Sequence, residues 1–208
     1  MVVQYEKTVG LLRRVLHRLV SNPWLFDRVQ YLLGYGQILR HCRPYLVQTD
    51  NQIILDVGAG TGNLAPLSPR STLYIWLDND PQKLQGFKTK WPFGLAMLGD
   101  ATRIGLKNKS VGYALCVDLT HHLSDNDLIL LFRELARVVK EKLIFVDAVE
   151  NKRSKISNFL WKYDKGSHPR SLKVLYSAIE SWFEVEHIEH FSMYHRYVLC
   201  VGIPKHHT

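Results

Sequence analysis

QIILDVGAGTGNL, residues 52–64, is the stretch that decides the fold. Its first half, Ile53 to Val57, is an apolar run bounded by glycines, which is typical of a central parallel strand. The glycines at alternate positions then predict a sharp turn whose backbone a ligand can approach closely. A helix should follow, with its first N–H groups facing that ligand. Asp56 places a carboxylate near the end of the strand, where open α/β sheets bind ligands.

Two common cofactor loops do not fit these glycines. A phosphate-binding P-loop needs a lysine and then serine or threonine after its last glycine, and Asn63-Leu64 stands there instead. A dinucleotide fingerprint needs a third glycine at the position of Asn63. The string DVGAGTG, residues 56–62, instead resembles the first motif of class I S-adenosylmethionine-dependent methyltransferases. In that motif an acidic residue precedes three glycines at alternate positions.

The resemblance continues at the ends of two later strands. A strand over 72–77 is followed by DNDP, residues 78–81, which is similar to the second motif of the family. The resemblance implies that the acid, Asp78, binds the cofactor ribose. A strand over 95–98 ends at GDA, residues 99–101, where the resemblance implies that the acid and the next backbone N–H recognise adenine. Without the resemblance, DNDP would be a capped helix start and GDA an ordinary turn.

The resemblance therefore implies S-adenosyl-L-methionine as the cofactor and no metal. It implies a cofactor site made of Asp56, Gly58, Ala59, Gly60, Gly62, Asp78, Asn79, Asp100, Ala101 and Val117.

The acceptor side is marked by histidines and by a basic segment. The fourth strand, 112–117, runs into DLTHHL, so His121 and His122 follow it where acceptors bind in such enzymes. Either ring could act as a general base, although helix-start packing or surface exposure would also explain them. Residues 150–170 are strongly basic without clear periodicity, which predicts a loop over the acceptor. In it, His168 and Arg170 are candidates for binding an anionic group; a solvated connection is the alternative.

The alternation of strands and helical stretches predicts a single α/β domain over residues 1–208. We expect a helical cap in 1–50 with helices over 3–20, 23–33 and 37–43, a cofactor-binding core in 51–150, and a substrate-side segment with a closing hairpin in 151–208. Ser124 and Ser171 should each cap the helix that follows. The sheet should be Rossmann-like, with seven mostly parallel strands in the order 3-2-1-4-5-7-6, helices on both faces and an antiparallel C-terminal hairpin. Pro66 and Pro69 should shorten the helix after the glycine loop.

Composition limits the function classes. The chain has 208 residues and a formal charge of +8, which suits an anionic partner or a merely solvated basic surface. Its three scattered cysteines and the lack of a long apolar run predict a cytoplasmic protein with reduced thiols and no transmembrane segment. A small polar or anionic acceptor is the first choice, because the base-methylating motif NPPY is replaced by DLTH. An RNA or protein methyltransferase, or a methyltransferase-like protein without turnover, remains the alternative.

Overall fold

The structure is a computed structural model that describes residues 28, 34–46, 51–163 and 168–206. The helices expected over 3–20 and 23–33 lie outside these residues, apart from Arg28, which is helical. In chain order the described elements are α3 (Tyr35–Leu46), β1 (Ile53–Val57), η1 (Ala65–Leu67), β2 (Leu73–Asp78), α4 (Pro81–Lys90), β3 (Leu95–Leu98), β4 (Val111–Val117), η2 (Thr120–His122), α5 (Asp125–Val138), β5 (Val139–Val149), α6 (Lys155–Tyr163), α7 (Leu172–Glu180), β6 (Phe183–Ser192) and β7 (Arg196–Pro204).

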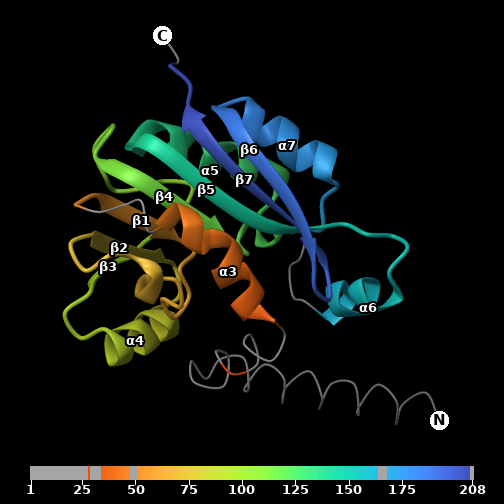
Figure 1. Ribbon diagram of the computed structural model, residues 1–208, viewed down its shortest axis with the longest axis horizontal. Coiled ribbons are helices and arrows are strands. Elements are labelled where there is room, and N and C mark those ends of the chain that lie inside the picture. Colours follow the sequence, from red (N-terminus) through yellow and green to blue (C-terminus); the bar gives the residue numbers. More distant parts are fainter. Residues whose placement is uncertain (1–27, 29–33, 47–50, 164–167, 207–208) are drawn as a thin grey trace.

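The strands form one seven-stranded sheet of order β3-β2-β1-β4-β5-β7-β6 (Figure 1). Strands β1 to β5 are all parallel, whereas β7 runs antiparallel to both β5 and β6. The predicted order and the antiparallel C-terminal hairpin are confirmed. Strand β1 lies between β2 and β4, as its glycine-bounded apolar sequence predicted.

Helices cover both faces of the sheet, because alternate residues of the central strands point in opposite directions. On one face, Leu55 and Val57 join a buried cluster with α5 and α7. On the other, Ile54 and Leu115 pack with α3 and with Trp161 of α6. Figure 1 shows α3 in front of the strands and α5 with α7 behind them. Both faces of β1 are therefore buried, which explains its continuous apolar sequence.

Two local expectations about helix length have different outcomes. The helix after the glycine loop is reduced to the single turn η1, with Pro66 in its first positions, as predicted. Helix α3, however, continues through Pro44 to Leu46, although the sequence predicted an end at Arg43. Ile38, Cys42 and Leu46 lie one turn apart and are fully buried. Burying Leu46 with the other two outweighs the hydrogen bond that Pro44 cannot donate.

The expectation of an aperiodic segment over 150–170 is wrong, because α6 occupies its middle. Ser157 and Trp161 are buried one helical turn apart against the closing hairpin. A serine and a tryptophan do not make a visible apolar stripe, so periodicity could not reveal this helix. The caps at the starts of α5 and α7 were predicted correctly, with Ser124 and Ser171 each accepting a backbone N–H from three residues on.

Candidate functional site

Four carboxylates come together because the parallel strands end at the same edge of the sheet. Asp56 and Asp78 lie at the ends of β1 and β2, Asp118 follows β4, and Asp147 lies in β5 beside them. Open parallel sheets bind their ligands at this carboxyl edge. The candidate site therefore has two halves, the glycine loop with Asp78 and the end of β4 with Asp147.

The glycine loop is held in a conformation that its glycines make possible. Gly58, Gly60 and Gly62 have φ of 69°, 54° and 76°, in the left-handed region that other residues rarely adopt. At Gly58 a Cβ would lie 2.8 Å from Leu119, and at Gly62 it would lie 2.5 Å from Phe87. These two glycines are thus required for packing of the loop as well as for its turn, which the sequence did not reveal.

Asp78 anchors this loop to β2. Its Oδ2 accepts the Gly60 N–H at 2.8 Å, and its Oδ1 accepts the Asp80 N–H at 3.0 Å. A carboxylate oxygen accepts two hydrogen bonds, so each oxygen keeps an acceptor position for a ligand diol. Burial raises the pKa of Asp78, and the two backbone donors oppose that rise.

Asp56 lies deeper than a ligand-binding carboxylate would. It is buried, and the Tyr74 hydroxyl donates to it. Burial raises its pKa to about 7, while the Tyr74 hydrogen bond lowers it and the charge of Asp78 raises it further. Asp56 is thus placed to support the loop from behind.

The remaining residues of the expected cofactor site lie along the same edge. Asp100 is exposed, and its Oδ1 accepts the backbone N–H and the hydroxyl of Thr102, both at 2.8 Å. This is the local turn that the alternative interpretation described, and it leaves the second oxygen available to a ligand. Ala101 is half-buried, Asn79 is exposed and Val117 is buried at the end of β4.

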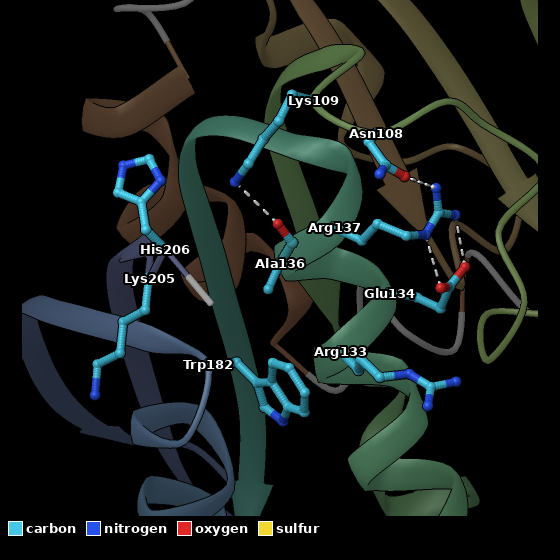
Figure 2. Close-up of a pocket in the computed structure, with 9 residues that line it drawn as sticks. All are labelled: Asn108, Lys109, Arg133, Glu134, Ala136, Arg137, Trp182, Lys205 and His206. Carbon is cyan, nitrogen blue, oxygen red and sulfur yellow. Dashed lines mark hydrogen bonds and ion pairs between the residues drawn. The ribbon is translucent and has the colours of Figure 1, made fainter. Parts of the chain in front are cut away.

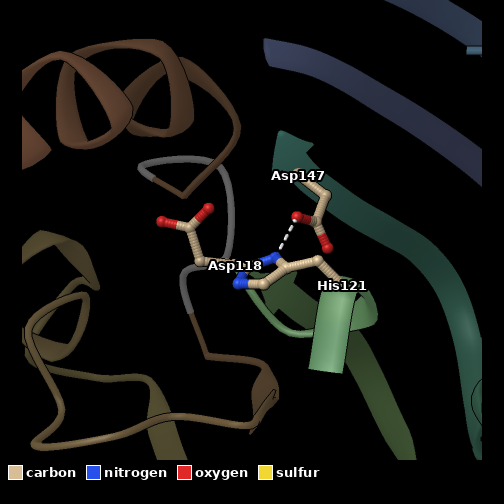
Figure 3. A group of neighbouring side chains, drawn as sticks. All are labelled: Asp118, His121 and Asp147. Atoms are coloured by element: carbon tan, nitrogen blue, oxygen red, sulfur yellow. Dashed lines mark hydrogen bonds and ion pairs between the residues drawn. The ribbon is translucent and has the colours of Figure 1, made fainter. Parts of the chain in front are cut away.

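His121 and Asp147 form a hydrogen-bonded pair on the other half of the site (Figure 3). His121 Nδ1 lies 2.7 Å from Asp147 Oδ1. Asp147 also accepts the backbone N–H and hydroxyl of Thr120 and the backbone N–H of Ala148. Burial pushes the pKa of Asp147 upward, but His121 and these hydrogen bonds outweigh it and hold the pKa below its usual value. Because the ionised carboxylate only accepts, Nδ1 carries a proton and the neutral ring has its lone pair on Nε2.

Asp118 completes a group of three whose potential ligand atoms all lie within 4.8 Å of one another. It has φ of 51°, an uncommon conformation for a residue with a side chain, and Figure 3 shows the second ring nitrogen of His121 on its side. A metal ion would need an oxygen of Asp147, yet four donors already occupy that carboxylate. The group therefore suits proton transfer better than metal binding.

Two aromatic side chains, Trp161 and His195, lie behind this pair. The Trp161 ring lies 5.4 Å from that of His121 and 4.3 Å from that of His195. His195 Nδ1 is 2.7 Å from the buried Ser157 hydroxyl, and burial lowers the pKa of His195 to about 4, so the ring is neutral near pH 7. Sequence analysis missed Asp118, Asp147, Trp161 and His195 as site residues. The position of both aspartates at strand ends was the one signal available.

The expected role of Arg170 needs correction, whereas that of His168 stays a prediction. Arg170 is buried, and its guanidinium donates to the carbonyls of Thr120 and Leu123 at 2.7 and 2.6 Å and to Asp125. Its fifth N–H reaches the His168 carbonyl, so Arg170 holds η2 instead of presenting its charge to an acceptor. His168 is exposed, and its backbone N–H donates to the carbonyl of His121.

A cavity of about 530 Å³ lies at the opposite edge of the sheet (Figure 2). It is lined by Asn108, Lys109, Arg133, Glu134, Ala136, Arg137, Trp182, Lys205 and His206. Arg137 is bound to Glu134, and Lys109 donates to the last carbonyls of α5. These charges stabilise the end of α5, so we place the chemistry at the carboxyl edge instead.

None of the helices in the described part of the chain is long and apolar enough to cross a bilayer. No curated protein matches the sequence. Residues 54–142 match the family described as methyltransferase domain.

Solved structures resemble the fold at low sequence identity. A magnesium protoporphyrin IX methyltransferase from Synechocystis with bound S-adenosylhomocysteine has a TM-score of 0.70 and 15% identity, over 92% of this chain and all of that one. A Haloferax volcanii methyltransferase in complex with the Trm112 activator has a TM-score of 0.76 and 12% identity, over 92% and 98%. A Pyrococcus horikoshii protein has a TM-score of 0.69 and 17% identity, over 82% and 91%. Residues 54–142 thus match a methyltransferase domain, and the fold is shared with a methyltransferase that was solved with S-adenosylhomocysteine, the product form of the cofactor S-adenosylmethionine.

Proposed function

We propose that this protein methylates a small polar acceptor at an atom that must lose a proton, such as a hydroxyl oxygen or an amine nitrogen. The observation that carries the proposal is the buried Asp147 carboxylate, which fixes His121 at the carboxyl edge of β4 and β5. The bound cofactor would supply an activated methyl group on a sulfonium. The protein then contributes mainly position and proton transfer.

The cofactor half follows the resemblance residue by residue. Gly58 to Gly62 would lie against the amino-acid part of the cofactor, and Asp78 would accept hydrogen bonds from the ribose hydroxyls. The unused acceptor positions of Asp78 support this assignment. Asp100 and Ala101 would recognise adenine, and Val117 would pack against the ring. Asp56 would act through the loop.

On the acceptor half of the site, His121 would take up the proton that the acceptor loses. In the neutral ring Nδ1–H donates to Asp147, so Nε2 can take the acceptor's proton as the methyl group is transferred. Asp147 is held by three further hydrogen bonds and stabilises the imidazolium that forms. His122 is exposed and its ring lies 4.1 Å from that of His121. We assign the proton transfer to His121, because Asp147 fixes its Nδ1.

An RNA or protein acceptor is the second candidate. The RNA version is favoured by the formal charge of +8, which suits an anionic partner. Such an enzyme would show turnover with RNA or protein and little with small molecules. The basic surface of this chain would then make activity fall steeply with salt.

The cofactor half is tested by binding alone. Replacing Asp78 with alanine should remove two hydrogen bonds and weaken S-adenosylmethionine binding by about 1.5–3 kcal/mol, which is roughly ten- to a hundredfold. Isothermal titration calorimetry measures the difference. Equal affinity of wild type and variant would refute the ribose assignment, and preference for NAD would refute the cofactor.

The acceptor half is tested with labelled S-adenosylmethionine and a panel of phenols, alcohols, amines and carboxylic acids. On any acceptor that is methylated, His121→Gln should lower turnover by roughly 10²- to 10⁴-fold while cofactor affinity is kept. The matched control is His122→Gln, which should retain turnover. If the two variants are equally active, His121 is not the base; if only RNA or protein is methylated, the small-acceptor proposal fails.

A further inference from the structure

Helix α6 has an exposed outer face. The inner face of this helix carries the buried Ser157 and Trp161, which fix it to the closing hairpin. The outer face therefore has a defined orientation. We call Lys155, Ile156, Phe159 and Lys162, together with the preceding Lys152 and Arg153, the α6 face.

Two large apolar side chains protrude from the α6 face. Ile156 is 67% exposed and Phe159 is 60% exposed. They are three residues apart, so they are neighbours on the helix surface. Among the described helices, α5 and α7 each expose a single large apolar residue, Ile129 and Val174. An adjacent exposed pair differs from single apolar residues scattered over a surface, because exposing each of these side chains to water costs free energy that a partner could recover.

The charge around this pair has one sign. Lys152, Arg153, Lys155 and Lys162 are all exposed, and no acid occurs between residues 151 and 163. Among the described residues that flank this stretch in sequence, Glu150 is acidic, and its carboxylate is 3.8 Å from Lys152 Nζ. Asp164 follows the stretch on its other side in the sequence. The α6 face thus combines protruding apolar side chains with a surplus of cations, which is the pattern of helices that lie in the interface of an anionic membrane.

We propose that the α6 face docks onto an anionic lipid surface. Ile156 and Phe159 would enter the boundary between headgroups and acyl chains, and the surrounding cations would attract anionic headgroups. RNA is the competing partner for a basic surface, and Phe159 could stack on a base. Ile156 has no π face to stack and gains nothing from phosphate, so the pair favours lipid over RNA.

The test uses the intact chain and vesicles of phosphatidylcholine with and without phosphatidylglycerol. Co-sedimentation should show binding to the anionic vesicles, weakened by salt, and little binding to phosphatidylcholine alone. Phe159→Ser and Ile156→Ser should each lower the partition coefficient roughly tenfold. Lys155→Gln and Lys162→Gln should each lower it about fivefold.

Val174→Ser on α7 is the matched control, because Val174 is 47% exposed yet lies outside the α6 face; it should bind as wild type does. Thermal unfolding confirms that each variant is folded. No binding to anionic vesicles at low salt would overturn the proposal. So would equal losses in Phe159→Ser and Val174→Ser, or RNA binding that needs Lys155 and Lys162 without any vesicle binding. Co-sedimentation does not measure methyl transfer, so the outcome for lipid binding is independent of the proposed reaction.

Discussion

Asp56 is a carboxylate whose environment differs from the one that its place in the sequence suggested. Its position before the glycines suggested a ligand-binding acid, but it is buried and bound by Tyr74. The sequence placed the residue correctly at the end of β1. It could not show which face of the strand Tyr74 would occupy, because that depends on the register Asp56↔Trp76 between β1 and β2.

Burial of Asp56 gives a pH prediction. Its pKa is about 7 in the folded protein against a reference of 3.8. Between these values the folded state binds more protons than the unfolded state, so this group makes the free energy of unfolding fall as pH rises from about 4 to about 7. The stability of Asp56→Asn relative to wild type should therefore rise between pH 5 and pH 8, by on the order of 2.5 kcal/mol.

Urea denaturation of both proteins at the two pH values measures this difference. Asp147 titrates in the opposite sense, since its pKa is lowered and its contribution is lost as pH falls. Subtracting the variant from wild type removes that background. A stability difference that does not change with pH would contradict a raised pKa at Asp56.

At the scale of elements, the basic segment after β5 has a structural role that its composition concealed. Arg170 donates to carbonyls on both sides of His121 and so fixes the turn η2. In the sequence, Arg170 is visible only as one basic residue in a polar stretch. The contacts that decide its role span about fifty residues, from Arg170 to Thr120, and no local pattern records them. The strand boundaries and caps, in contrast, depend on neighbours in sequence and were predictable.

Arg170→Ala should be strongly destabilising. It removes the buried guanidinium that donates to the carbonyls of Thr120 in η2 and of Leu123 just after it, and we expect a loss of about 2–4 kcal/mol in the free energy of unfolding. The ion pair contributes little of this, because Asp125 is 88% exposed. Arg170→Lys should recover only part, since an ammonium cannot reproduce the planar fork.

The matched control is Lys162→Ala, at an exposed residue, which should stay within about 0.5 kcal/mol of wild type. Proton NMR of the His121 ring adds a local readout, because its resonances should shift in Arg170→Ala and not in the control. Equal stability of the two variants would mean that Arg170 does not hold η2.

At the scale of the whole molecule, the sheet order followed from the sequence because its causes are general. Right-handed crossovers and a first strand apolar on both faces leave few arrangements for the parallel strands. The acceptor side of the site could not be predicted from the sequence, because it is assembled from η2, α6 and the turn before β7. His121, Trp161 and His195 meet only after the hairpin has packed on β5.

The three thiols report on the cooperativity of this assembly. Cys116 in β4 and Cys200 in β7 are buried in the sheet, and Cys42 lies on the buried face of α3. Burial raises the pKa of Cys42 and of Cys200 to about 12, and raises that of Cys116 as well, so none should react with an alkylating reagent while folded.

Exposure of Cys42 needs only the detachment of α3, whereas exposure of the strand thiols needs the sheet to open. Labelling in increasing urea, followed by mass spectrometry, should therefore modify Cys42 first and the two strand thiols together at the global unfolding rate. S-adenosylmethionine at a hundred times its dissociation constant should slow the strand thiols about a hundredfold, since binding adds about 2.7 kcal/mol to the folded state. Modification of Cys116 ahead of Cys42 would mean that the sheet opens before α3 leaves it.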